Sequence, residues 1–91
     1  MAVEILTGSG KVTVPDEACD ELASRLALFG APDAAERLLG HRAIRPEDRP
    51  VVREVLARWH RSSPDRFPQE LVALQEQIGR DLQRNLRSNS R

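Results

Sequence analysis

The segment Gly8-Ser9-Gly10-Lys11 contains the glycine and lysine residues that phosphate-binding loops use. Such a loop requires the pattern G-x-x-x-x-G-K-[ST], followed by a helix whose free N–H groups face the phosphates. Here Ile5 stands where the first glycine is required, and Val12 replaces the hydroxyl residue that holds magnesium. Lys11 also leads into an extended, alternating segment instead of a helix. We therefore expect a hairpin turn here and no nucleotide site.

Three other residues could bind a metal or attack a substrate, namely His41, His60 and Cys19. The histidines are 19 residues apart, and neither has a Cys or His at the spacing of three or four that zinc sites use. Cys19 falls at the core spacing of a predicted helix, which favours a small buried side chain. The serines show no nucleophile-elbow pattern. We therefore expect no catalytic residue, no metal ligand and no cofactor, and we predict that the protein is not an enzyme.

Charged side chains form an acidic edge and two arginine-rich stretches. The acidic edge consists of Asp16, Glu17, Asp20 and Glu21, and the basic stretches contain Arg42, Arg45, Arg49, Arg53, Arg58, Arg61 and Arg66, and then Arg80, Arg84, Arg87 and Arg91. Each can be a solvated face, while the acidic edge could contact a basic partner and the arginines could contact phosphate. Fourteen basic and fourteen acidic residues give a net charge of zero.

The balanced charge is unevenly distributed along the chain. Residues 1–40 contain three basic and seven acidic side chains, a net charge of −4, and residues 41–91 contain eleven basic and seven acidic ones, a net charge of +4. A dipolar molecule of this kind can pair with itself or with a charged partner. The zero total excludes a chain-wide polycation that coats nucleic acid.

The elements that must position these residues are a hairpin and four helices. Alternating apolar residues around the Gly-containing turn predict a β-hairpin over 2–14. Proline, glycine and apolar spacings of three and four predict helices at about 15–29, 32–40, 48–61 and 67–87, and the third takes Asp48 as its N-cap. We expect an α+β, mainly helical fold, with a single small domain over 1–88 and a frayed tail at 89–91.

The last predicted helix is the longest, and it is amphipathic. Apolar residues recur along one side of it every three to four positions: Phe67, Leu71, Leu74, Ile78, Leu82 and Leu86. A single core is thin in a chain of this size. We therefore expect this stripe to dock another protein chain, either a second copy or a different partner.

Residues 11–39, KVTVPDEACDELASRLALFGAPDAAERLL, are similar to the ribbon-helix-helix repressors and antitoxins. That family has a short strand ending in Pro, then a helix, a Gly-containing turn and a second helix. The resemblance implies a strand that pairs between two copies and faces the major groove of DNA, with Lys11 and Thr13 toward the bases and the turn near Gly30–Asp33 toward phosphate. It also implies a C-terminal segment, residues 48–88, that grasps a toxin.

The sequence favours a bacterial cytoplasmic protein that is not inserted in a membrane. No apolar run approaches the length of a membrane span, the N-terminus lacks the features of a secretory signal, and the single cysteine fits a reducing compartment. We expect a small non-enzymatic adaptor that uses its C-terminal helix to bind either a different protein or a second copy of itself as a homodimer. The alternative is a dimeric DNA-binding regulator of the antitoxin type.

Overall fold

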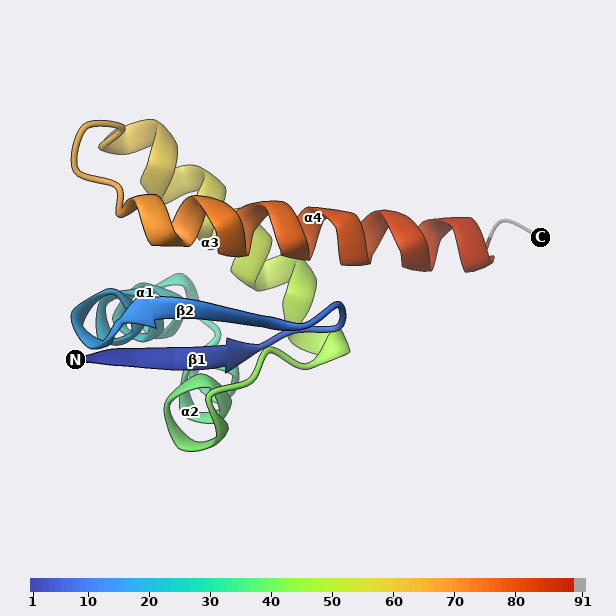
Figure 1. The fold of residues 1–91 in the computed structure, drawn as a ribbon, viewed down its shortest axis with the longest axis horizontal. Helices are drawn as coiled ribbons and strands as arrows, with labels where there is room; N and C mark the ends of the chain where they lie inside the picture. The colour runs from blue at the N-terminus through green and yellow to red at the C-terminus, as the bar shows by residue number, and fades with distance from the viewer. Residues whose placement is uncertain (90–91) are drawn as a thin grey trace.

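The computed structural model describes the backbone of residues 1–89 and the side chains of residues 1–83. It consists of a hairpin followed by four helices, which confirms the predicted mainly helical α+β fold (Figure 1). The elements are β1 (Ala2–Leu6), β2 (Lys11–Pro15), α1 (Asp16–Phe29), α2 (Pro32–His41), the 3-10 helix η1 (Pro46–Asp48), α3 (Arg49–Ser62) and α4 (Gln69–Asn89). None of the described helices combines the length and apolar character needed to cross a bilayer.

The two strands pair within one chain, in an antiparallel register that places Ile5 opposite Val12. Both side chains are buried, while the next pair along, Glu4 and Thr13, is exposed. This alternation gives the hairpin one apolar face, which must be covered because a lone hairpin is marginal in water. The outer edge of β1 is extended by a short parallel bridge between Leu6 and Ala43.

The helices α1 and α2 are separated by a turn at Gly30. Gly30 has φ 104°, a left-handed conformation, and its N–H is bonded to carbonyls of the last turn of α1. This conformation favours glycine because a Cβ would clash there. Pro32 then begins α2. Proline has no backbone N–H, but this costs no helical hydrogen bond because the N–H groups of a first turn have no partner within the helix. The chain reversal at Gly30 packs α2 against α1.

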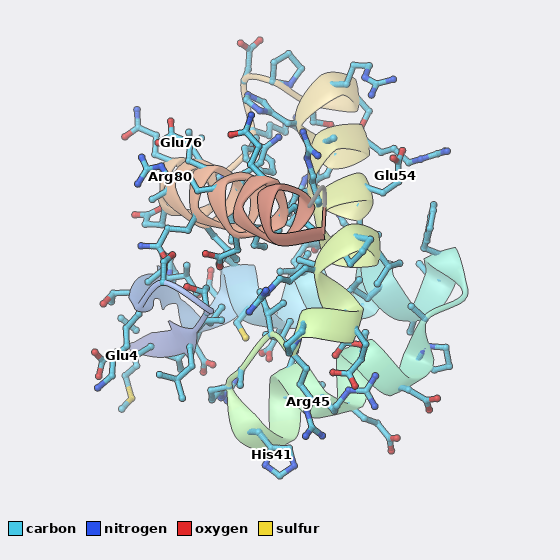
Figure 2. The ribbon with its side chains drawn as sticks, turned by 90° about the vertical axis from the view of Figure 1, so that its right-hand side faces the viewer. Glu4, His41, Arg45, Glu54, Glu76 and Arg80 are labelled. Carbon is cyan, nitrogen blue, oxygen red and sulfur yellow. The ribbon has the colours of Figure 1, made fainter. Side chains whose placement is uncertain are left out.

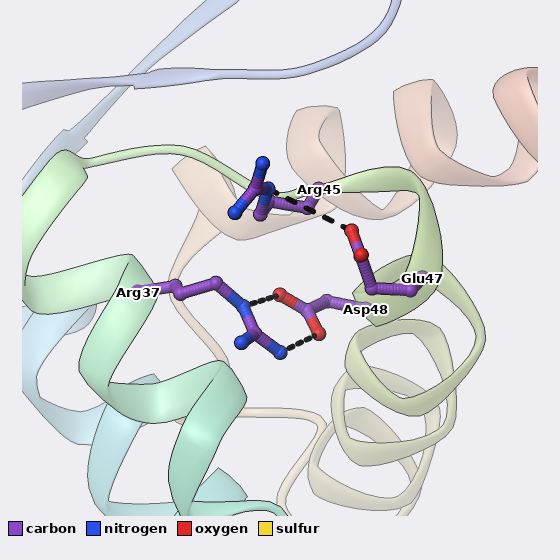
Figure 3. Close-up of polar contacts among 4 residues, drawn as sticks. All are labelled: Arg37, Arg45, Glu47 and Asp48. Carbon is purple, nitrogen blue, oxygen red and sulfur yellow. Dashed lines mark hydrogen bonds and ion pairs between the residues drawn. The ribbon is translucent and has the colours of Figure 1, made fainter.

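Asp48 is the N-cap residue of α3, as predicted, but its side chain does not form the expected cap bond. Its carboxylate makes no bond to the helix N-terminus and instead accepts two hydrogen bonds from Arg37 on α2, at 2.8 and 2.6 Å (Figure 3). A bidentate arginine–carboxylate contact is stronger than a cap bond to a neutral N–H. The predicted position of the cap is therefore confirmed, while the Asp48 carboxylate ties α2 to η1 instead of bonding to α3.

The last helix, α4, lies above the hairpin and crosses in front of α3 (Figure 1). Its C-terminal turns extend past the hairpin turn, along the longest dimension of the molecule, which measures 41 Å. All four predicted helices are found, with ends that differ by one or two residues. Asn89, predicted to be frayed, is the last residue of α4, and residues 90–91 lie outside the described part of the chain.

The core lies between the apolar face of the hairpin and the inner faces of α1, α3 and α4. Its members come from every main element and include Ile5, Leu22, Leu38, Leu56 and Leu74. The predicted inward position of Cys19 is confirmed, and Ile44 and Trp59 are buried as well.

Candidate protein-docking surfaces

Most of the apolar stripe of the C-terminal helix is already covered by the chain itself. Phe67, Leu71, Leu74 and Ile78 are all buried in the core. For these four residues the predicted docking surface is corrected, because a side chain enclosed in its own subunit has no surface to offer a partner. The remaining stripe positions are Leu82, which is half-buried against the core, and Leu86, whose side chain lies outside the described part.

The cover for the stripe comes from β2 and α3. Helix α4 contacts both elements, and Phe67, just before α4, packs its ring edge-on to Trp59 at 5.2 Å and flat against His60 at 4.4 Å between centroids. Apolar spacing identifies the face of a helix that needs burial, but it does not say which chain supplies the cover. Helix α4 therefore covers part of the apolar face of the hairpin.

Polar contacts also hold the hairpin turn against the middle of α4. The Thr7 hydroxyl donates to Gln77 Oε1 at 2.7 Å, and the Gly8 N–H donates to Asp81 Oδ2 at 3.1 Å. Asp81 is only 3% exposed. Judged by residue type and spacing alone, both α4 residues belong to the polar side of the helix. The available signal was that Asp81 follows Ile78 by three positions, which places it at the border of the apolar stripe.

Lys11 and Thr13, the residues expected to face DNA, are both exposed on β2. Thr13 lies opposite Glu4, so a carboxylate stands beside the predicted DNA-reading strand (Figure 2). The resemblance implied that this strand pairs between two copies. Here β2 pairs with β1 of its own chain, and its buried side chains belong to the core.

Cys19, the one cysteine, lies on α1 and is enclosed in the hydrophobic core. Its sulfur accepts a hydrogen bond from the Arg42 guanidinium at 3.1 Å. Burial raises the pKa of the Cys19 thiol, and the Arg42 bond offsets only part of that effect. A thiol held in its protonated form is a poor nucleophile.

A shallow groove between α3 and α4, here named the α3–α4 groove, lies beside the exposed end of the stripe. Its lining residues are Arg53, Glu76, Gly79, Arg80, Leu82 and Gln83. Arg80 and Glu76 form a loose ion pair at 3.7 Å and project into solvent from α4 (Figure 2). Among the side chains that the structure describes, Arg53 makes no ion pair.

A second groove, between α1 and α3, is more apolar and is here named the α1–α3 surface. It is lined by Arg25, Leu28, Phe29, Val55, Arg58, Trp59 and Ser62. The sequence alone does not reveal this surface, because Phe29 falls at the three-to-four spacing of the apolar residues of α1 and Leu28 lies off that spacing. Their position at the last turn of α1, next to the chain reversal at Gly30, leaves them outside the core.

Neither surface brings together a set of metal-ligating side chains among the residues that the structure describes. Within residues 1–83, no three His, Cys, Asp or Glu side chains converge on a point where a metal ion could sit. Both surfaces instead combine apolar side chains with arginine, which is the composition of protein contacts. No protein-family model, no curated protein and no solved structure matches this chain.

Proposed function

We propose that this protein is a small non-enzymatic interaction module that binds an acidic, partly apolar segment of another protein in the α3–α4 groove. The proposal rests on the presence of a glycine, Gly79, in the middle of α4. At such a position a residue with a side chain would make the helix more stable. A Cβ built at Gly79 meets no atom within 4 Å. The fold itself therefore does not require a glycine here.

Gly79 lowers the stability of α4 and opens its surface at the same position. Glycine inside a helix costs about 1 kcal/mol relative to alanine. A helix without a side chain at one position lets another backbone approach closely. Because nothing within the chain uses the space at Gly79, we assign the space to the partner.

The charge of the groove indicates the chemistry of that partner. Arg53 and Arg80 line the groove together with Leu82, and Glu76 is the one acidic group among the lining residues. From Arg80 to the end, the sequence contains four arginines and a single acidic residue, Asp81, which is buried. Carboxylates on the partner would be attracted to this end of α4 and would form charge-assisted bonds with the guanidinium groups.

Leu82 supplies the apolar contact. It is the stripe residue that the core covers only in part, and in the sequence the stripe continues to Leu86. The docking role predicted for the whole stripe is thereby confined to its outer end. An acidic segment with a leucine or phenylalanine facing Leu82 would match the groove.

A selection from a random peptide library displayed on phage tests this proposal, with the full chain as bait. We expect enriched peptides to combine Asp or Glu with Leu or Phe, and their titration to shift the amide signals of Arg53, Gly79 and Leu82 in a two-dimensional NMR spectrum. Arg53→Glu should weaken binding about tenfold or more. Arg66→Glu, an equal charge change at an exposed site outside the groove, should leave binding unchanged.

Gly79→Ala provides a sharper variant, because it should act in opposite directions on stability and on binding. The chain should unfold at a higher temperature while its affinity for the selected peptides falls. A gain in stability with full affinity would show that no partner approaches Gly79. Enriched peptides that shift signals elsewhere would contradict the proposal as a whole.

The DNA-binding alternative predicts a different result in a duplex-binding assay. A DNA reader would bind duplex with an affinity that falls steeply with salt, and Lys11→Ala or Thr13→Ala would weaken it. Salt-dependent duplex binding that these variants reduce, with no groove-directed peptide selected, would favour the regulator over the interaction module.

A further inference from the structure

The last turn of α1 exposes two large apolar side chains beside an apolar groove. Leu28 is 87% exposed and Phe29 is 44% exposed, while the groove next to them is lined by the buried residues Val55 and Trp59. A projecting apolar pair next to a recess marks a contact site. We propose that a second copy of this chain covers the α1–α3 surface and forms a symmetric dimer.

The shape of the surface favours a second copy because a projection and a recess lie side by side. In a two-fold dimer the same patch meets itself, so a feature of one copy faces the neighbouring feature of the other. Leu28 of one copy can enter the groove at Val55 and Trp59 of the other, and the reverse contact forms by symmetry. One pair of surfaces thereby buries both leucines.

The charged side chains around the groove also favour a second copy as the partner. On α1, Glu21 accepts from Arg25 at 2.9 Å, and on α3, Glu54 accepts from Arg58 at 2.8 Å. Each helix presents a carboxylate one turn before a guanidinium, and the four charges sum to zero. An acidic or a basic partner would meet repulsion from half of this set, whereas an inverted copy presents the opposite sign to each group.

The two guanidinium groups are held in place by aromatic rings. Arg25 lies 4.4 Å from the ring centroid of Trp59, and Arg58 lies 5.2 Å from that of Phe29. Each uses its Nε atom for the bond to its own glutamate. The terminal N–H groups remain available to carboxylates of the second copy.

This dimer is independent of the proposed partner site. The α1–α3 surface and the α3–α4 groove share no residue, so a variant in one leaves the lining of the other intact. Leu28→Glu should leave peptide binding in the α3–α4 groove unchanged, and Gly79→Ala should leave dimerisation unchanged. The failure of one proposal is thus distinguishable from the failure of the other.

Sedimentation equilibrium of the full chain tests for the dimer. Over about 10 µM to about 1 mM, the apparent mass should rise from the monomer value of 10.2 kDa toward twice that value. Leu28→Glu should weaken association at least about tenfold. Leu39→Glu is the matched control, because Leu39 is another exposed leucine, on α2 and outside the surface, and it should associate like the parent.

A pair of charge variants tests the symmetry without assuming which groups meet. One chain carries Glu21→Arg and Glu54→Arg, and the other carries Arg25→Glu and Arg58→Glu. Each alone should be monomeric because the patch then repels its own copy. An equimolar mixture should form a mixed dimer at least as tight as that of the parent.

Three results would overturn the proposal. They are a parent chain that stays monomeric over the whole concentration range, a dimer that survives Leu28→Glu, and charge variants that do not associate when mixed. Far-UV circular dichroism verifies folding of each variant. If a double variant does not fold, the comparison of Leu28→Glu with Leu39→Glu decides, since both replace exposed side chains.

Discussion

Arg37 and Asp48 form an ion pair between α2 and η1, neither of which lines a candidate surface (Figure 3). The hydrogen bond to Asp48 raises the pKa of the Arg37 guanidinium above its ordinary value. A cation whose pKa is raised by folding contributes stability at every pH below its unfolded pKa. Because arginine titrates above any working pH, rising pH does not remove this contact.

Folding stabilises the charged form of Arg37, but it disfavours the charged form of Cys19, the thiolate. Burial raises the pKa of the thiol above its ordinary value of 9.0. The unfolded chain therefore loses its thiol proton first as the pH rises. Stability from this group is fully present below about pH 9 and is lost as the pH rises above that value.

We predict that Cys19 is slow to react in the folded protein and that it makes stability decline in alkali. Its reaction with a disulfide reagent near pH 8 should be at least about 100-fold slower than in concentrated guanidinium chloride. Between about pH 8 and about pH 10, the free energy of unfolding should fall more for the parent than for Cys19→Ala. Equal losses in both chains would contradict the assignment.

At this scale the sequence could predict burial better than it could predict partners. Cys19 was expected in the core because its position matches the apolar spacing of a helix. Asp48 was expected to cap a helix because local rules favour that bond. Its actual partner, Arg37, is 11 residues away, and local rules carry no information on which arginine a fold brings near.

Among the elements, the hairpin and α4 depend on one another most. The hairpin turn meets α4 through Thr7 and Gln77 and through Gly8 and Asp81. A Cβ at Gly8 would meet the Arg49 guanidinium and would stand 3.1 Å from Asp81 Oδ2. Glycine at this position therefore lets the turn approach α4 without displacing the Arg49 side chain.

We predict that Asp81→Ala loosens the hairpin turn, whereas Asp81→Asn does not. Alanine leaves the Gly8 N–H without an acceptor, which should cost about 1–3 kcal/mol, and asparagine retains an acceptor oxygen. Amide hydrogen exchange at Gly8 should accelerate about tenfold or more in the alanine variant and remain near the parent rate in the asparagine variant. Unchanged exchange in Asp81→Ala would show that the turn is held by other groups.

The helices themselves were predictable because their signals are local. Proline, glycine and three-to-four spacing mark where each begins and ends, and the structure follows them closely. The main shift is in α4, which begins after Pro68 instead of at Phe67. What the helices pack against was not predictable, since that depends on contacts between residues far apart in the chain.

In the molecule as a whole, the main role of α4 is to complete the core. Leu71, Leu74 and Ile78 close the core over the hairpin, so most of the stripe contributes to folding. A chain of this size has about 5–15 kcal/mol of stability in total. Loss of one of these contacts therefore removes a large part of it.

We predict that Leu74→Ala lowers the free energy of unfolding by about 2–5 kcal/mol. Urea unfolding, followed by circular dichroism, measures this change. At temperatures where the variant is still folded, its self-association in the ultracentrifuge should equal that of the parent. Full stability combined with lost association would instead restore Leu74 to a docking surface.

The contact between Thr7 and Gln77 joins residues that are 70 positions apart. At a translation rate of about 5–20 residues per second, the ribosome makes Gln77 about 4–14 seconds after Thr7. During this delay the part of the apolar hairpin face that α4 covers stays open, although α1 can already pack against the strands. A chaperone that shelters β-strands, or rapid completion of the chain, would keep this segment from aggregating.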